Sequence, residues 1–230
     1  MEVVIIWKDN LDYWNDEGLQ LKVKQGFYWR WLFFLAGIVV LSLGIALTIK
    51  GQMLGVGSWD VLHIGLANHL GLTVGTWSII LGLIILGIDA YFSKRVPKIG
   101  TYLDMFLTGI FMDLFLMVLP DAHGWLEQSV AFILGLILLG FGCGMYMVAN
   151  IGVGPRDTLM LLLVQRVGWS VTRARTTMEV SVAIIGFLLG GPVGIGTIFM
   201  AFGLGPIVQW ALKLNEKLFY RAAGVESAVI

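Results

Sequence analysis

The chain has 230 residues, of which 58% are hydrophobic and only 13% are charged, and its formal net charge at neutral pH is zero. This composition, with a mean hydropathy of +0.86, excludes an ordinary water-soluble domain, which carries roughly twice as much charge, and indicates an integral membrane protein. The zero net charge supplies no basic surface for nucleic acid, and the single Cys143 excludes a disulfide framework and a cysteine-rich metal site.

The chain begins with residues 1–30, in which short apolar stretches alternate with lysine and acidic residues. A signal peptide would need a basic start, an apolar run and a small-residue cleavage site in that order, so none is expected. We predict a solvated cytoplasmic N-terminal segment that carries no chemistry.

Six stretches come close to, or reach, the roughly 20 apolar residues that a helix needs to cross a bilayer. They are residues 31–50, 75–93, 101–120, 129–149, 174–191 and 196–213. The pattern predicts an all-α polytopic protein embedded in a lipid bilayer, followed by a cytoplasmic C-terminal tail at 216–230.

Lysine and arginine flank these spans on alternate connections. They gather in the lead-in, the second connection, the fourth connection and the tail. The third connection, with Asp121, His123 and Glu127, and the fifth, at 190–194, contain neither, and the first has only Lys50. Because basic connections stay on the cytoplasmic side, the pattern predicts that both termini face the cytoplasm.

The chain also contains an internal repeat. Leu-Gly-Val-Gly-Ser-Trp-Asp-Val-Leu, within residues 54–75, returns about 97 positions later, within 151–172, as Ile-Gly-Val-Gly-Pro-Arg-Asp-Thr-Leu. A repeat of this kind indicates duplication. Each copy holds three spans, an odd number, so the second copy must enter the membrane from the opposite side. We therefore predict two inverted-topology repeats, at residues 31–120 and 129–215.

Each repeat includes one short segment, 54–70 in the first and 151–168 in the second. Both are led by glycines, largely apolar, interrupted by polar groups and too short to span. Such segments at matching places in two halves favour re-entrant or broken short helices. Two amphipathic helices lying in the interface, and two further spans that would make the repeats parallel, are the alternatives.

The Gly-x-Gly-x-x-Asp motif of these segments places an aspartate in the first turn of each short helix. A carboxylate there can cap free N–H groups and meet the positive end of the helix dipole, which is a purely structural role. In the functional interpretation, two helix N-termini meet at the midplane and form a site for an anionic or polar solute, where the carboxylates accept a proton or coordinate a cation. The candidate solute-binding residues are Gly55, Gly57, Asp60 and His63 in the first copy and Gly152, Gly154, Arg156 and Asp157 in the second.

Two further polar positions lie inside the spans, where a charge costs about 2.5–3.5 kcal/mol and usually faces protein or water. Asp113 lies about midway along the third span, and the repeat register pairs it with Gln209 in the sixth. We predict that these two side chains share a polar path, and a hydrogen bond between helices is the alternative. Asp104 and Glu179 are weaker candidates.

The chain resembles the YczE/YyaS/YitT group of bacterial integral membrane proteins over residues 31–215. The resemblance rests on Gly-Val-Gly-Ser-Trp-Asp-Val-Leu-His (55–63), Gly-Leu-Thr-Val-Gly (71–75) and Gly-Val-Gly-Pro-Arg-Asp-Thr-Leu-Met (152–160). Ser58 departs from the Gly-x-Gly-Pro-x-Asp signature of that group, in which proline is common at this place. The resemblance implies a protein of the bacterial cytoplasmic membrane and supplies no substrate.

These features predict a small secondary transporter or channel for a small polar or ionic solute. No Walker-type, His-Glu-x-x-His or Gly-x-Ser-x-Gly segment occurs, so we expect neither enzymatic activity nor a cofactor or metal. A non-transporting scaffold or regulator is the alternative, and an enzyme acting on lipid through Arg156, Asp157, Arg173 and Arg175 is a third. The expected partners are the bilayer and the solute, with a homo-oligomer left open.

Overall fold

A computed structural model describes residues 27–94 and 96–223, so most of the predicted N-terminal segment and the end of the predicted tail lie outside the described residues. The described residues form eight α-helices and one short 3-10 turn, which confirms the all-α prediction. The elements are α2 (Phe27–Lys50), η3 (Gln52–Leu54), α3 (Ser58–Leu70), α4 (Val74–Ser93), α5 (Ile99–Val118), α6 (Trp125–Val148), α7 (Pro155–Val167), α8 (Val171–Leu188) and α9 (Ile195–Ala223).

Five helices within these described ranges are long and apolar enough to cross a membrane, namely α2, α4, α5, α6 and α9. The outer faces of the bundle carry large apolar side chains, which suit lipid rather than water. Exposed examples are Leu83, Ile84, Ile88, Ile133, Leu134 and Phe202. The sixth predicted span, 174–191, falls on α8, which is helical but is not among the five, because Arg173, Arg175 and Glu179 raise its charge.

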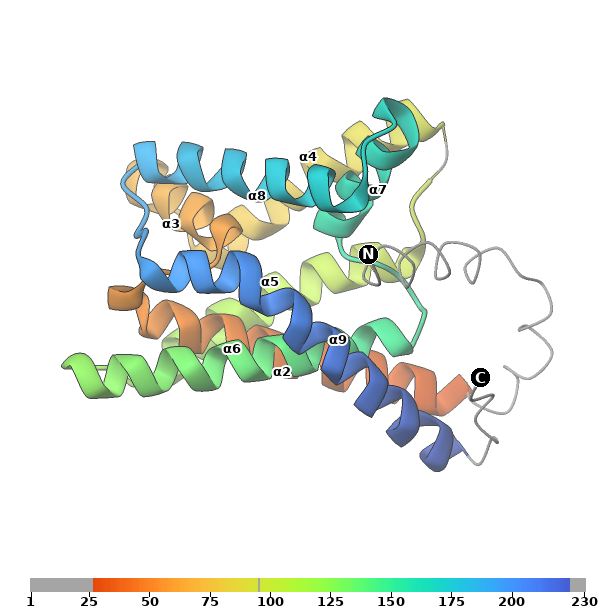
Figure 1. Ribbon diagram of the computed structural model, residues 1–230, viewed down its shortest axis with the longest axis horizontal. Coiled ribbons are helices and arrows are strands. Elements are labelled where there is room, and N and C mark those ends of the chain that lie inside the picture. Colours follow the sequence, from red (N-terminus) through yellow and green to blue (C-terminus); the bar gives the residue numbers. More distant parts are fainter. Residues whose placement is uncertain (1–26, 95, 224–230) are drawn as a thin grey trace.

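The two short predicted segments form α3 and α7, each of 13 residues. At a rise of about 1.5 Å per residue each is roughly 20 Å long, well short of the roughly 30 Å hydrocarbon core. Figure 1 shows α3 and α7 towards opposite ends of the bundle. Their length argues against the alternative of two further spans.

The junctions that follow the two short helices are built alike. Gly71 and Gly168 end α3 and α7 with φ angles of 71° and 73°, a conformation that glycine adopts without strain. Thr73 and Ser170 then cap α4 and α8, and their side-chain oxygens accept hydrogen bonds from the backbone three residues on, at 3.1 and 3.3 Å. Local sequence therefore sets both junctions in the same way.

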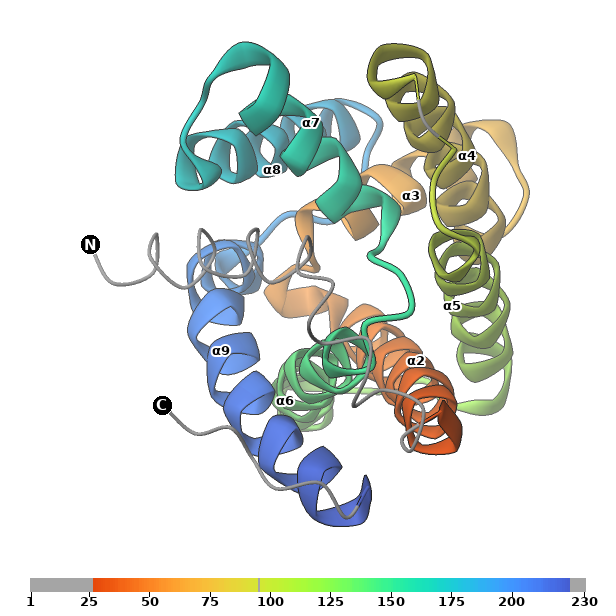
Figure 2. The same ribbon diagram turned by 90° about the vertical axis from the view of Figure 1, so that its right-hand side faces the viewer.

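The centre of the bundle is the pair α2 and α6, which pack side by side (Figures 1 and 2). Glycines allow the two backbones to touch: a Cβ on Gly44 would lie 2.7 Å from Cα of Leu139, and one on Gly142 would lie 2.8 Å from Cα of Leu41. Around this pair, α5 packs on α2 and α9 on α6, while α3 packs on α8 and α7 on α4. Each short helix therefore packs against a long helix of the other sequence copy.

Contacts between connections show which helix ends lie together. Lys50, at the end of α2, forms an ion pair with Asp121, which lies between α5 and α6. The hydrogen bond from Lys50 also holds the pKa of Asp121 below its usual range. At the start of α2, Nε of Arg30 donates a hydrogen bond of 2.8 Å to the carbonyl of Ala149. The first and third connections thus lie at the same end of the bundle, as the charge pattern predicts.

The last helix continues past the predicted span 196–213 and includes residues 216–223 of the predicted tail. Asn215 is fully buried, and its amide donates hydrogen bonds to the carbonyls of Phe141 at 3.3 Å and Ala211 at 2.9 Å. The ring of Phe219 meets that of Phe33 edge-on at 5.3 Å between centroids. These contacts attach the end of α9 to α6 and α2, which hydropathy alone does not indicate.

Candidate functional site

A cavity of about 160 Å³ lies where α3 and α7 begin, near the middle of the bundle. All eight described helices contribute side chains to its wall. A cavity of about 150 Å³ is large enough to hold a benzene ring. The cavity therefore suits a solute of that order of size.

The first turns of the two short helices form a large part of the wall. Ser58, Trp59 and Asp60 line it from α3, and Pro155, Arg156 and Asp157 line it from α7. Both helices have glycine at the N-cap, and no side chain caps either end. The first-turn N–H groups are therefore left without the usual side-chain partner.

The wall contains more than half of the predicted site residues. Those that line the cavity are Gly57, Asp60, His63, Gly154, Arg156 and Asp157. Gly55 and Gly152 do not line it: a Cβ on Gly55 would lie 2.9 Å from Cα of Gly194, and one on Gly152 would lie 2.8 Å from Cα of Gly100. These two glycines allow the chain to pack closely at the starts of α9 and α5.

The structure does not bring Asp113 and Gln209 to the cavity. The Asp113 carboxylate accepts a hydrogen bond from the Thr73 hydroxyl and another, of 2.8 Å, from the N–H of Gly75. It therefore ties α5 to the first turn of α4, which is the helix–helix hydrogen bond considered as the alternative. Gln209 is half-buried on α9 and lies outside the wall.

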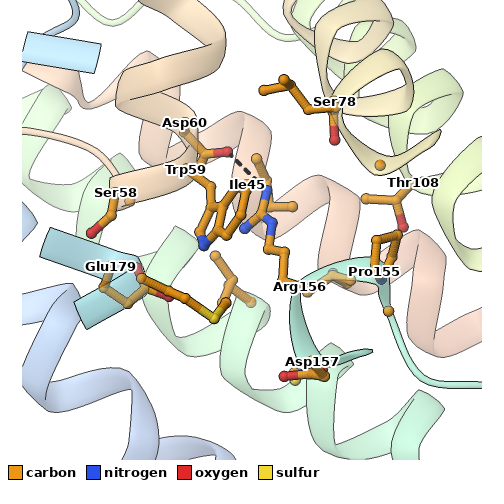
Figure 3. Close-up of a pocket in the computed structure, with 18 of the residues that line it drawn as sticks. Ile45, Ser58, Trp59, Asp60, Ser78, Thr108, Pro155, Arg156, Asp157 and Glu179 are labelled. Carbon is orange, nitrogen blue, oxygen red and sulfur yellow. Dashed lines mark ion pairs between the residues drawn. The ribbon is translucent and has the colours of Figure 1, made fainter. Parts of the chain in front are cut away.

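Asp60 lies at the centre of a charged cluster in the wall and is only 1% exposed. Its Oδ1 lies 3.5 Å from Nδ1 of His63 and 3.6 Å from Nη2 of Arg156, both longer than an ordinary hydrogen bond. The Arg156 guanidinium also lies 5.3 Å from the centroid of the Trp59 ring, and Figure 3 shows it between α3 and α7. Since Trp59 and Arg156 occupy equivalent positions in the repeat, this contact joins the two copies.

Asp157 and Asp104 form a second acidic group in the wall. Oδ2 of Asp157 accepts a hydrogen bond of 3.3 Å from the hydroxyl of Tyr146 on α6. A Cβ on Gly154 would lie 3.0 Å from Oδ2 of Asp104 and 3.6 Å from the Tyr146 hydroxyl oxygen. Glycine at position 154 therefore leaves room for these polar groups beside the start of α7.

Several lining residues lie outside the motif. Asp104 and Glu179 among them are the weaker candidates from the sequence, whereas Ser78, Tyr146 and Arg175 were not predicted as site residues. Ser78 lines the cavity from α4, Tyr146 from α6, and Arg175 and Glu179 from α8. The repeat register relates some of these positions to one another. Ser78 in the first copy aligns with Arg175 in the second, and Gly82, which also lines the cavity, aligns with Glu179. A lining position in one copy thus points to its equivalent in the other.

Buried polar atoms without a hydrogen-bond partner gather in this wall. They are Oδ1 of Asp60, Nδ1 of His63, Oδ1 of Asp104, Oγ1 of Thr108 and Nε1 of Trp59. Most buried polar groups in native proteins have a partner, so each exception calls for an explanation such as bound water or an ion. Five such atoms around one cavity suit a polar ligand.

Comparisons with known proteins agree with the sequence resemblance. Residues 28–213 match the family described as "Family of unknown function (DUF6198)". The chain is 40% identical over 208 residues to the "Uncharacterized membrane protein YczE" of Bacillus subtilis, which covers 90% of this chain and 97% of that protein. It is 30% identical over 193 residues to the "Uncharacterized protein YyaS" of the same organism, with coverage of 83% and 96%.

An uncharacterized protein of Haemophilus influenzae is 30% identical over 184 residues, which is 80% of this chain and 84% of that protein. No solved structure matches the chain significantly. The matches extend over most of the described helices and confirm the predicted relationship to YczE and YyaS of Bacillus subtilis: the chain belongs to the DUF6198 family.

Proposed function

We propose that this protein is a secondary transporter or channel, and that a small polar or ionic solute passes through the central cavity. The observation that carries the proposal is the set of buried polar atoms around the cavity that have no hydrogen-bond partner, near the first turns of α3 and α7. A buried polar group that makes no hydrogen bond destabilises a fold by about 1–3 kcal/mol. In a scaffold whose repeated segments served only packing, this destabilisation would bring no advantage. In a solute site, the same polar atoms bind the solute.

We propose further that the chain is built from two inverted repeats, each with three spanning helices and one short re-entrant helix. The packing of α2 on α6 supports this arrangement, because the pair Gly44 and Leu139 is matched by the pair Gly142 and Leu41 with the roles of the helices exchanged. The exchanged packing of α3 on α8 and α7 on α4 supports it as well. A two-fold relation between the halves accounts for both.

In this arrangement α8 crosses the membrane although it carries charge. Arg175 and Glu179 line the cavity and therefore face the protein interior rather than lipid, as intramembrane charges usually do. Arg173, nearer the start of the helix, lies 5.0 Å from the centroid of the Trp169 ring, in the manner of a residue at the membrane interface. Both termini would then face the cytoplasm, and the cytoplasmic membrane of a bacterium is the proposed location.

A ligand screen on the purified full chain tests the proposed site. A solute that binds only the folded state raises its stability by about 2.7 kcal/mol at one hundred times its dissociation constant, which raises Tm. We expect members of a panel of small polar and ionic solutes to raise the Tm of the wild type. Asp60→Asn and Asp157→Asn should each abolish that increase, since both replace a carboxylate of the wall with a neutral amide of similar size.

Asp89→Asn is the matched control. Asp89 lies on α4 outside the cavity wall, where its carboxylate accepts a hydrogen bond of 2.7 Å from the Ser93 hydroxyl, so the solute should still raise the Tm of this variant. If both cavity variants fold and keep the full wild-type increase, the cavity is not the solute site.

A further inference from the structure

We propose that the cavity binds a small organic cation, a guanidinium or an ammonium compound, against Trp59 and Asp60, in the place that the guanidinium of Arg156 occupies in this structure. This inference rests on the proposed function and names the class of solute. It makes Arg156 a tethered competitor of the solute rather than one of its ligands.

The charge of the wall favours a cation. Four carboxylates line the cavity, namely those of Asp60, Asp104, Asp157 and Glu179, whereas the guanidinium groups that line it are those of Arg156 and Arg175. A charge inside a membrane protein is costly unless an opposite charge compensates it. With carboxylates in excess, the missing compensation is positive.

Trp59 and Asp60 together have the chemistry of an organic-cation site. The face of an indole ring attracts a cation within about 6 Å of its centroid, and quaternary ammonium ligands are commonly held this way. The adjacent Asp60 carboxylate is 1% exposed, and its Oδ1 has no hydrogen-bond partner. An aromatic face and a buried carboxylate oxygen that accepts no hydrogen bond thus adjoin the same cavity.

Arg156 occupies this position only loosely. Its Nη2 lies 3.6 Å from Oδ1 of Asp60, beyond hydrogen-bond distance, and its side chain remains 38% exposed while that of Asp60 is 2% exposed. Figure 3 shows the guanidinium beside Trp59, at the end of a side chain that reaches across from α7. An arginine side chain has several rotatable bonds, so a free cation can take its place without movement of either helix.

The remainder of the wall suits an organic rather than a bare metal cation. Thioether side chains line it from four helices, namely those of Met105, Met160, Met178 and Met200. Methionine is flexible and polarizable and adapts to the shape of alkyl groups. Within the described ranges no three His, Cys, Asp or Glu side chains come together as a metal site would require. The cavity of about 160 Å³ limits the solute to about the size of a benzene ring.

Two cationic probes and their neutral analogues test the inference on the wild-type full chain. Methylguanidinium and tetramethylammonium are compared with methylurea and tert-butanol at constant ionic strength, and dissociation constants are measured by calorimetry and by the increase in Tm. We expect at least one cation to bind and the neutral analogues to bind at least about tenfold more weakly, since they lack the charge that Asp60 and Trp59 recognise. This comparison needs no variant to fold.

Three variants then assign the position of the cation. Arg156→Met removes the tethered competitor, whose effective concentration is of millimolar order, and should tighten cation binding about tenfold or more. Trp59→Leu should weaken it about tenfold or more, because the substitution removes the aromatic face that attracts the cation. Arg173→Met is the matched control, because Arg173 makes a similar contact with Trp169 outside the cavity; it should leave binding unchanged.

Two results would overturn the inference: methylurea binding as well as methylguanidinium, or weaker cation binding in Arg156→Met. Failure of the proposed function gives a different result. A cation that binds as expected but never crosses proteoliposome membranes supports the cation site and contradicts transport. Movement of a neutral or anionic solute without cation binding contradicts the cation site and supports transport.

Discussion

Ser78→Phe should abolish solute binding, with a loss of affinity of at least about a hundredfold, while the protein remains folded. Ser78 lines the cavity from α4, and Figure 3 shows it at the opposite side of the view from Asp157. A phenyl ring fills a cavity of about 150 Å³, close to the 160 Å³ available here. Thermal unfolding of the variant shows that it is folded, so that loss of binding can be assigned to the filled cavity.

Ser129→Phe is the control for this substitution. Ser129 lies on α6 outside the cavity wall, where its hydroxyl donates a hydrogen bond of 2.7 Å to the carbonyl of Trp125. Solute binding, measured by calorimetry, should be the same in this variant as in the wild type. Binding that survives in a folded Ser78→Phe variant would show that the solute occupies another place.

Gly44→Ala should destabilise the protein by about 2 kcal/mol, near the middle of the range for overpacking a well-packed core. A Cβ at this position would lie 2.7 Å from Cα of Leu139 and 2.8 Å from the carbonyl oxygen of Gly135. Both neighbours are backbone atoms of α6 and cannot rotate away, so the two central helices must separate. The free energy of unfolding in mixed micelles measures the effect.

Gly87→Ala provides the comparison within a helix of the same bundle. No atom lies within 4 Å of a Cβ built on Gly87, and alanine is the better helix former by about 1 kcal/mol. This variant should be as stable as the wild type or more stable. Equal destabilisation of the Gly44 and Gly87 variants would contradict the close packing of α2 on α6.

Much of the fold can be predicted because its signals are local. Runs of apolar residues indicate the five helices that are long and apolar enough to cross a membrane. Gly71 with Thr73 marks the junction between α3 and α4 in the same way that Gly168 with Ser170 marks the one between α7 and α8. Two other features depend on tertiary contacts and are not evident from hydropathy: the presence of charged residues within α8, and the extension of α9 beyond its apolar run. Arg175 and Glu179 are tolerated beside the cavity, and Asn215 is buried against α6.

The candidate site could be predicted best where the motif itself carries it, and Asp104 and Glu179 outside the motif were only weaker candidates. Asp60 and Asp157 line the cavity because the motif places them in the first turns of helices that begin there. Asp104 and Asp113 lie nine residues apart on α5, which is about two and a half turns, so they face opposite sides of the helix. Hydropathy does not reveal which side faces the cavity, and the packing of α5 selects Asp104.

Solute counterflow in proteoliposomes tests most directly whether the central cavity is a transport site. The labelled solute is the one that most raises the Tm of the wild type, and each variant is first shown to be folded by its thermal unfolding. The wild type and Asp89→Asn should exchange the solute, while the double variant Asp60→Asn, Asp157→Asn should show only the rate of protein-free liposomes. Wild-type exchange by the folded double variant, or no exchange by the wild type itself, would contradict this account.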